Sequence, residues 1–308
     1  MQYEPVPDSP ALLITMGKGH SLRRILVIAD LHLGRETELA RAGLTIPSRT
    51  EAVAEDVLAL CKKTKAEGLI LLGDIKHNVP RTSWQEWREV PAFFSTLARA
   101  LGSITIVIGN HDAGLRQMLP EGTDNITITG QHIITEEEGE GGSISSIGLV
   151  HGNRWPTPEL MACDAMVMAH NHPTVVFVDP LGGRSFHQCW IRSPVSRQAA
   201  LSHFGEDAAI KISEVVIMPS FLEYTQGTSF NVPRPGLLGP ILTSGVADVP
   251  RARVYLLDGT HLGELKDIVV DIDIRGRYDE GRPVARSKKS RRRFRPRNKK
   301  RGKREVRR

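Results

Sequence analysis

The stretch Ile25-Leu26-Val27-Ile28-Ala29-Asp30-Leu31-His32 decides the fold of this 308-residue chain. Its first five residues are apolar without interruption and rich in β-branched side chains, which is typical of a short strand that is buried on both faces of a sheet. The run stops at Asp30, a residue type that strands avoid. The stretch therefore predicts an interior strand with polar side chains directly after its carboxyl end.

Two further apolar runs repeat this pattern. Residues 69–72 (Leu-Ile-Leu-Leu) stop at Gly73-Asp74, and residues 104–108 (Ile-Thr-Ile-Val-Ile) stop at Gly109-Asn110-His111-Asp112. Each run predicts another buried strand followed by polar residues.

Helical segments separate the three predicted strands. Pro47 and the capping-box pattern at 48–51 (Ser-Arg-Thr-Glu) predict the start of the first helix. We expect Pro91 in the first turn of the second helix, because proline is tolerated there and not in a helix interior. Alternation of strands and helices at this spacing indicates right-handed βαβ units, and open sheets of this kind bind ligands beyond the carboxyl ends of their strands.

The second half of the chain is richer in strands, which we expect at 144–150, 165–169, 175–178, 215–219 and 254–257. Together the two halves predict an α/β fold of two facing mixed β-sheets flanked by helices, a four-layer α/β/β/α sandwich. Apolar residues become scarce from Arg275 onward. We therefore expect an N-terminal extension over 1–20, one domain over 21–275 and a disordered basic tail over 276–308.

The charge is divided between this tail and the rest of the chain. Fifteen of the 41 lysines and arginines lie from Arg286 to Arg308, beside one acid, Glu305, so this segment has a formal charge of +14. Residues 1–285 hold 26 bases and 34 acids, a formal −8. Dense basic charge binds polyanions by counterion release, so Arg286–Arg308 predicts nucleic acid as a partner. A solubilising tail and a contact with anionic membranes are the alternatives.

Composition and motifs exclude several classes of protein. No segment approaches the roughly 20 apolar residues that cross a bilayer, and the start lacks a signal-peptide pattern, so we expect a cytoplasmic protein without a membrane span. Cys61, Cys163 and Cys189 are too widely spaced for a thiolate zinc site and are predicted to be core residues. No GxSxG elbow, P-loop or GxGxxG follows a predicted strand, so serine hydrolases and nucleotide-binding enzymes find no support.

Five blocks of Asp, Asn and His residues follow predicted strands. They are Asp30-Leu31-His32, Gly73-Asp74, Gly109-Asn110-His111-Asp112, His151-Gly152 and His170-Asn171-His172. One such block alone is more often a cap or a surface feature, but five at strand ends are hard to explain as caps. Carboxylate, amide and imidazole ligands without thiolates suit Mn, Fe, Zn or Mg. So many donors exceed what one ion uses, which predicts two divalent ions about 3.5–4 Å apart.

These blocks, in the order DLHLG, GDIKH, GNHD, HGN and AHNHP, resemble those of the calcineurin-like metallophosphoesterases over roughly residues 25–180. The chain is most similar to the prokaryotic ICC-like phosphoesterases, which are similar to repair nucleases and to ligase-associated DNA-damage phosphoesterases. The resemblance implies two ligand sets that share Asp74 as a bridge: Asp30, His32, Asp74 and His172 for one ion, and Asp74, Asn110, His151 and His170 for the other.

The resemblance also implies roles outside the ligand sets. His111 is expected to be the catalytic histidine, and Asp112 the acid that fixes its tautomer and orientation. Manganese is the expected metal, with iron, zinc or magnesium as alternatives. Related repair nucleases often form homodimers, so the resemblance leaves a homodimer open for this chain.

The GDIKH block departs from the GDxxD or GDxxY that is common in the family. The tyrosine of purple acid phosphatases is missing, so a ferric tyrosinate site is not expected. Arg35, Lys76 and His77 lie next to the expected ligands and are candidates for contacts with substrate phosphate. Arg35 and Lys76 are nearly as well explained as solvated side chains, and His77 as a further metal ligand or a donor behind the ligands.

The sequence thus predicts a phosphoesterase that hydrolyses phosphodiester bonds of nucleic acid or nucleotides by in-line attack of a metal-activated hydroxide. The alternative is a nucleic-acid-associated binding protein with a weak or small-molecule phosphomonoesterase centre. The complete ligand set and His111 favour catalysis, because a binding module would not need them.

Overall fold

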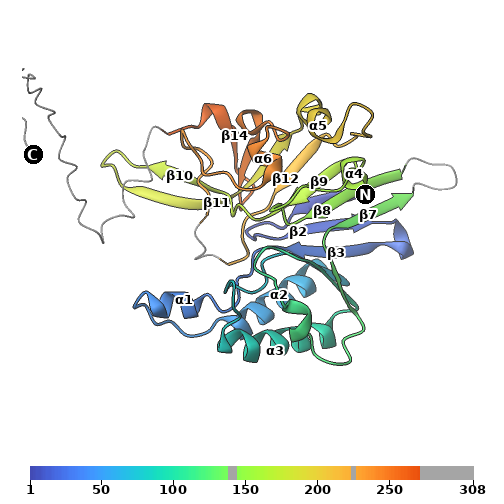
Figure 1. Ribbon diagram of the computed structural model, residues 1–308, viewed down its shortest axis with the longest axis vertical. Coiled ribbons are helices and arrows are strands. Elements are labelled where there is room, and N and C mark those ends of the chain that lie inside the picture. The colour runs from blue at the N-terminus through green and yellow to red at the C-terminus, as the bar shows by residue number, and fades with distance from the viewer. Residues whose placement is uncertain (138–143, 223–226, 271–308) are drawn as a thin grey trace, which may run out of the picture. The chain divides into compact units, whose positions relative to one another are not determined.

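Two mixed β-sheets face each other, and helices cover their outer faces (Figure 1). The computed structural model describes residues 1–137, 144–222 and 227–270. The predicted basic tail, 276–308, lies outside the described residues, as does the predicted end of the domain at 275.

The first sheet has six strands in the order β1-β2-β3-β4-β5-β6. Strands β3 to β6 run parallel, whereas β1 and β2 are antiparallel to their neighbours. The strands are β1 (Gln2–Pro5), β2 (Leu12–Met16), β3 (Arg23–Ile28), β4 (Gly68–Leu72), β5 (Ser103–Val107) and β6 (Ile126–Thr129).

The first 20 residues, expected to precede the domain, instead contribute β1 and β2 to this sheet. Leu12 and Ile14 alternate toward the neighbouring sheet and are fully buried there. Burial of these two side chains explains why the segment pairs with β3 instead of remaining an extension.

The second sheet has the order β14-β13-β11-β12-β9-β8-β7, and β10 pairs with β11 beside it. Strands β8, β9 and β12 are parallel, and the other pairs are antiparallel. The strands are β7 (His132–Glu137), β8 (Ile144–Val150), β9 (Ala165–Met168), β10 (Thr174–Val178), β11 (Arg184–Pro194), β12 (Glu214–Ile217), β13 (Arg253–Leu256) and β14 (His261–Glu264).

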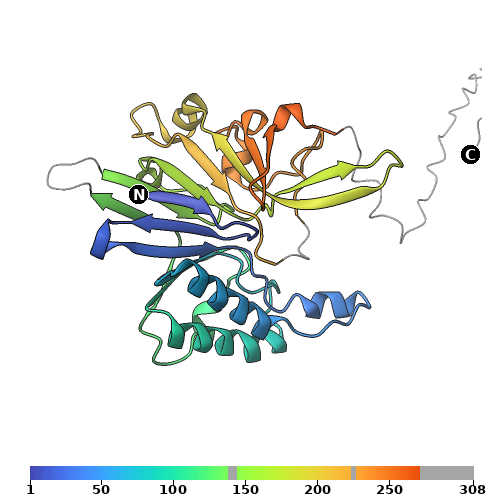
Figure 2. The ribbon, with the colours of Figure 1, turned by 180° about the vertical axis from the view of Figure 1, so that it is seen from behind.

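Helices complete the four layers (Figure 2). Helices α2 (Thr50–Thr64) and α3 (Trp84–Ala100) pack on the outer face of the first sheet. Residues of α4 (Pro158–Met161), α5 (Arg197–Phe204) and α6 (Pro240–Thr243) are buried against the second sheet. The short α1 (Glu36–Arg41) follows β3, and single 3-10 turns lie at Gly19–Ser21, Leu115–Met118, Val249–Arg251 and Leu265–Asp267. This arrangement confirms the predicted sandwich.

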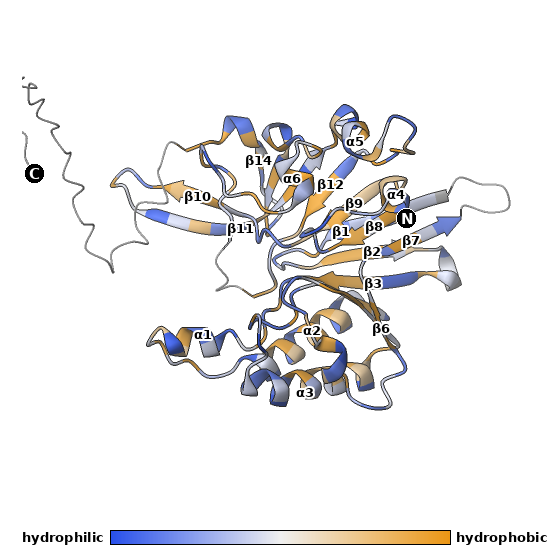
Figure 3. Cartoon of the chain, viewed as in Figure 1, coloured by the Kyte–Doolittle hydropathy of each residue, from blue (hydrophilic) through white to orange (hydrophobic). Residues whose placement is uncertain are grey.

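The apolar runs are buried on both faces, as predicted. In β3, Leu26 and Ile28 belong to the core beneath the helices, whereas Val27 belongs to the core between the sheets. In β4, Leu71 and Leu72 divide in the same way. Figure 3 shows the hydrophobic residues gathered in the central strands. Because these strands are fixed from both sides, the loops that follow them start from defined positions.

Both predicted helix starts differ from the structure. Helix α2 begins at Thr50 after Arg49, and the Ser48 hydroxyl donates to the carboxylate of Glu89 instead of capping the helix. The capping box belongs to α3, where Ser83 and Glu86 satisfy each other's backbone amides. Helix α3 therefore begins well before Pro91, which lies in its interior and not in its first turn.

Two further predictions are tested by the described residues. Cys61, Cys163 and Cys189 are buried and form no disulfide, which confirms them as core residues. None of the helices described is both long enough and apolar enough to span a membrane.

Candidate metal centre

The five polar blocks come together where strands of both sheets end. The backbone amide of His170 donates to the Asp30 carboxylate at 3.1 Å, which joins the end of β9 to the end of β3. The ring of His151, after β8, lies 3.3 Å from the carboxylate of Asp74, after β4. The convergence expected from the sequence is therefore present.

The first group consists of Asp30, His32 and His172, whose ligand atoms all lie within 4.8 Å of one another. The Nε2 atoms of His32 and His172 are 3.1 Å apart, and Nε2 of His172 is 3.5 Å from Asp30 Oδ1. A second carboxylate borders this group, because Asp74 Oδ2 lies 3.9 Å from Nε2 of His32.

The second group consists of Asp74, His151 and His170 within the same 4.8 Å limit. Asn110 adds an amide oxygen, since its Oδ1 is 3.3 Å from Nε2 of His151. The Nδ1 of His151 faces the carbonyl of Leu72 at 3.2 Å. A proton on Nδ1 leaves Nε2 free to bind a cation, which is the usual arrangement for a metal-binding histidine.

The donors fit divalent cations. Asp30 is fully buried, and its Oδ1 accepts no hydrogen bond from the described residues. A buried carboxylate oxygen without a donor is costly, so this atom requires a positive partner. Carboxylate, amide and imidazole ligands are those that Mn, Fe, Zn and Mg accept.

Burial and neighbouring charges hold several side chains in the protonation state that binds metal. Burial lowers the pKa of His32 to about 3, and His172 lowers it further. Burial, helped by His151, lowers the pKa of His170 to about 4. Burial raises the pKa of Asp30, but the histidines His172 and His151 more than offset it, so its pKa lies below the usual value. Neutral imidazole and ionised carboxylate are the binding forms.

His151 behaves differently from the other two rings. Burial lowers its pKa, but the hydrogen bond to Asp74 and the charge of Asp30 outweigh burial and raise the pKa to about 9. The same contact keeps the pKa of Asp74 below its usual range, although burial acts to raise it. Two buried carboxylates therefore attract positive charge strongly to this point.

The backbone is strained at the same residues. Seven non-glycine residues have positive φ, and five of them are expected ligands: Asp30 (55°), His32 (44°), Asp74 (52°), His170 (71°) and His172 (43°). Each such conformation costs about 1–3 kcal/mol and persists only where the surroundings enforce it. Strain concentrated in this way is typical of functional sites.

Two glycines leave space for the ligands. A Cβ on Gly109 would lie 2.2 Å from Asp74 Oδ1, and a Cβ on Gly73 would lie 2.3 Å from Nδ1 of His151. Gly73 also has φ of 81°, which favours glycine. Any side chain at either position would displace a ligand of the second group.

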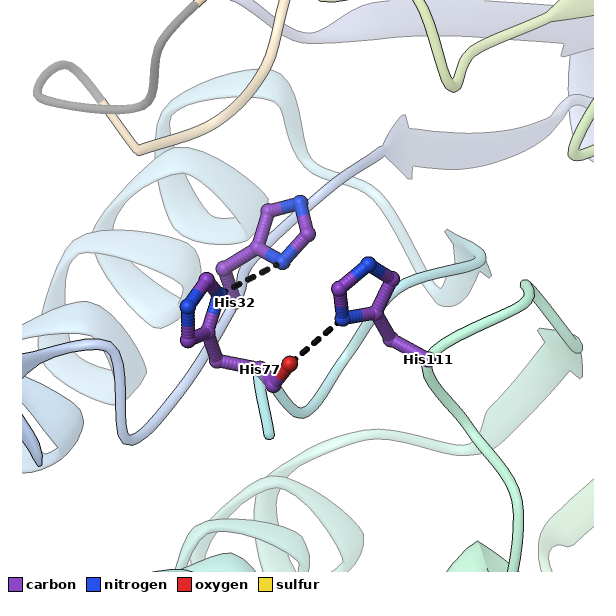
Figure 4. Close-up of side chains that lie close together, drawn as sticks. All are labelled: His32, His77 and His111. Carbon is purple, nitrogen blue, oxygen red and sulfur yellow. Dashed lines mark hydrogen bonds between the residues drawn. The ribbon is translucent and has the colours of Figure 1, made fainter. Parts of the chain in front are cut away.

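His111 lies beside the centre, but Asp112 does not orient it. Nε2 of His111 is 3.9 Å from Asp74 Oδ2, and Nδ1 is 2.5 Å from the carbonyl of His77 (Figure 4). The buried Asp112 carboxylate instead accepts the backbone amides of Gly109, Ile75 and Lys76. Its expected role is corrected accordingly, because the loop amides occupy the carboxylate and a main-chain carbonyl faces the ring. Burial raises the pKa of Asp112 to about 6.

The three candidate phosphate contacts lie in different surroundings. Lys76 is fully buried and donates to the carbonyl of Asn78 at 2.8 Å, so it does not face a substrate. Arg35 is half-buried and forms no ion pair with any described residue. His77 lies between His32 and Glu38 and packs along the ring of His111.

His77 connects a ligand to a carboxylate. Its Nε2 is 2.6 Å from Glu38, and its Nδ1 is 3.3 Å from Nδ1 of His32. Protons on Nε2 of His77 and Nδ1 of His32 satisfy both contacts and leave Nε2 of His32 toward His172. His32, His77 and His111 also form a third group whose ligand atoms lie within 4.8 Å.

Sequence reasoning missed Glu38 and Glu86, and it gave Asn171 no role. Glu86 accepts the amides of His77 and Asn78, and only its capping-box spacing from Ser83 marked it. The Asn171 carboxamide pairs with both backbone groups of Leu238 and fixes the loop between His170 and His172. Nothing in the spacing of Glu38 indicated its contact with His77.

Comparison with known proteins identifies one family. A family model described as calcineurin-like phosphoesterase matches residues 23–212. The chain matches no curated protein. Similar solved structures include the Pseudomonas putida nuclease MPE, at 20% identity and TM-score 0.43 over 83% of this chain and 98% of that one. They also include YfcE, a phosphoesterase from E. coli, at 22% identity and TM-score 0.33 over 53% of this chain and 76% of that one.

Proposed function

Because this chain belongs to the calcineurin-like phosphoesterase family and is a hydrolase acting on ester bonds, we propose that it is a two-metal phosphodiesterase acting on nucleic acid or nucleotides. The observation that carries the proposal is the position of Asp74. Its carboxylate is 3.9 Å from His32 Nε2 in the first group and 3.3 Å from His151 Nε2 in the second. One carboxylate at the border of two donor groups is suited to bridge two ions.

The remaining donors divide between the two positions. Asp30, His32 and His172 hold the first ion, and Asn110, His151 and His170 hold the second, each together with Asp74. When bound, divalent ions at such a site activate water near neutral pH and offset the charge of the phosphate oxygens. The oxygen and imidazole donors suit manganese, and iron, zinc and magnesium remain the alternatives.

His111 provides the proton for the leaving group. Nδ1 faces the carbonyl of His77 and donates to it, so Nε2 is the atom that faces Asp74 and the centre. A protonated ring there stabilises a developing oxyanion and can pass its Nε2 proton to the leaving oxygen.

Arg35 supplies a cation for the substrate. It forms no ion pair among the described residues, and its charge acts on the neighbouring His77. An unpaired guanidinium beside the centre suits a phosphate oxygen, to which it can donate two hydrogen bonds. We infer that Arg35 contacts the phosphate in place of Lys76.

Hydrolysis of bis(4-nitrophenyl) phosphate with Mn²⁺ tests the proposal. We expect Asp74→Ala to lose bound metal and more than about 100-fold in rate, since even residues behind the ligands cost 10- to 100-fold. His111→Ala should retain metal and lose about 10²–10⁴-fold. The exposed Asp207→Ala is the control. Equal rates for wild type, Asp74→Ala and His111→Ala would refute the phosphodiesterase.

A monoester substrate separates the alternative function. If 4-nitrophenyl phosphate is hydrolysed and the diester is not, the centre is a phosphomonoesterase. In that case the proposed action on nucleic acid is wrong, while the metal-dependent chemistry remains.

A further inference from the structure

Four consecutive backbone amides of the loop after β4 are bound by two buried carboxylates. Asp112 accepts the amides of Ile75 at 2.8 Å and Lys76 at 3.3 Å. Glu86 accepts the next two amides, those of His77 at 2.9 Å and Asn78 at 2.7 Å. The loop that begins with Asp74 is therefore held along its whole length by side chains from outside it.

Glu86 is itself fixed by α3. Only 1% of its surface is exposed. One carboxylate oxygen, Oε1, accepts both loop amides, and the other, Oε2, accepts the amide of Ser83 in the capping box. The backbone of Gly34 approaches so closely that a Cβ there would lie 2.6 Å from Cγ of Glu86. The carboxylate cannot turn away from the loop without breaking the start of the helix.

Peptide geometry links Glu86 to His111. The amide of Asn78 and the carbonyl of His77 belong to one planar trans peptide, so they point to opposite sides. With the amide anchored on Glu86, the carbonyl is directed toward Nδ1 of His111, 2.5 Å away. Loss of the anchor allows this peptide to rotate and removes the partner of the ring.

We propose that Glu86 is a positioning residue for His111. It acts through the peptide between His77 and Asn78, which keeps the proton of the ring on Nδ1 and the ring's Nε2 toward the centre. The inference rests on the proposed role of His111 in catalysis, but it concerns a residue of α3 that lies outside all five polar blocks.

Nuclear magnetic resonance of the full-length, Zn²⁺-loaded protein with ¹⁵N-labelled histidine tests the inference directly. His111→Ala assigns the ring signals. We expect the wild type to show a proton on Nδ1 of His111 that is protected from exchange with solvent. In Glu86→Ala this protection should be lost, because the carbonyl no longer has a fixed direction.

Kinetics with the diester provide the second readout. Glu86→Ala should lower kcat about 10- to 100-fold and leave KM within about twofold, since a misplaced catalytic group can cost 10²-fold. Glu86→Gln should recover most of the rate, because its amide oxygen can still accept both loop amides. Ser83→Ala is the matched control: it removes the other half of the capping box and should leave kcat and the Nδ1 proton unchanged.

The inference is overturned if folded Glu86→Ala, checked by circular dichroism, keeps both the protected Nδ1 proton and the wild-type kcat. If Glu86→Ala does not fold, Glu86→Gln decides. Normal kcat in Ser83→Ala with a loss in Glu86→Gln that exceeds the loss in Glu86→Ala would also contradict it. If the wild type hydrolyses no diester, the proposed function fails, and the Nδ1 signal still reports whether Glu86 orients the ring.

Discussion

At the scale of single residues, the backbone contributes as much to the site as the side chains do. Five expected ligands have positive φ, and Asp112 and Glu86 act on amides and not on the ring of His111. Ligand geometry therefore depends on residues that offer no donor to a metal. Gly109 is the clearest of these, because its missing side chain leaves room for Asp74.

We expect Gly109→Ala to weaken metal binding more than about tenfold. The added Cβ would lie 2.2 Å from Oδ1 and 2.5 Å from the backbone nitrogen of Asp74, so the expected bridging ligand must move. Titration of the metal-free protein with Mn²⁺ followed by calorimetry measures the effect. Gly130→Ala is the control, since nothing lies within 4 Å of its added Cβ. Equal affinity in both variants would contradict the close approach.

At the scale of elements, the sequence predicts the strands better than the helix starts. Residues 25–29 and 69–72 form strands because both faces are buried, and an uninterrupted apolar run reports that burial. Strands β1 and β2 were not predicted, since they are short and owe their pairing to contacts with the other sheet. The helix starts were misplaced because two Ser-x-x-Glu patterns compete, and only tertiary contacts select the one at Ser83.

The candidate site follows the same division. The polar blocks were found because each follows a buried strand, and topology brings strand ends together. The expected role of Asp112 and the expected exposure of Lys76 were wrong, because sequence position does not reveal that the loop between them folds over both side chains. Glu86 was missed because it acts from a helix that supplies no metal donor.

The two competing helix starts make a prediction about stability. Ser83→Ala should lower the free energy of unfolding by about 1 kcal/mol, the usual cost of a lost N-cap. Ser48→Ala should cost at most about 0.5 kcal/mol, as surface substitutions usually do, since Ser48 donates to the carboxylate of Glu89 and caps no helix. Urea denaturation of the two variants measures the difference. A larger loss in Ser48→Ala would show that the first pattern is the functional cap.

At the scale of the whole molecule, charge is divided along the chain. Residues 1–285 have a formal charge of −8, and the segment Arg286–Arg308 has +14. We propose that this segment binds nucleic acid, whereas the metal centre acts on a single phosphate. Attraction by dense basic charge is independent of sequence and falls steeply with salt.

Deletion of residues 286–308 tests this division of roles. We expect weaker binding to duplex DNA and a flatter dependence of affinity on salt, because fewer counterions are released. Turnover of bis(4-nitrophenyl) phosphate should stay within about twofold, since that substrate is too small to contact the segment. Fluorescence anisotropy at several salt concentrations measures affinity. A chain with a Gly/Ser segment of equal length is the control, and equal DNA affinity with and without the basic residues would refute the proposal.

The satisfied amides of residues 75–78 have a consequence for the reaction product. Free amides in consecutive residues form a nest that captures phosphate by themselves, but here all four donate to Asp112 and Glu86. A released phosphate monoester finds no anchor in this loop and is retained only by cations. Product inhibition by phosphate should accordingly appear with bound metal and vanish from the metal-free protein, so that metal exchange sets how readily the enzyme turns over.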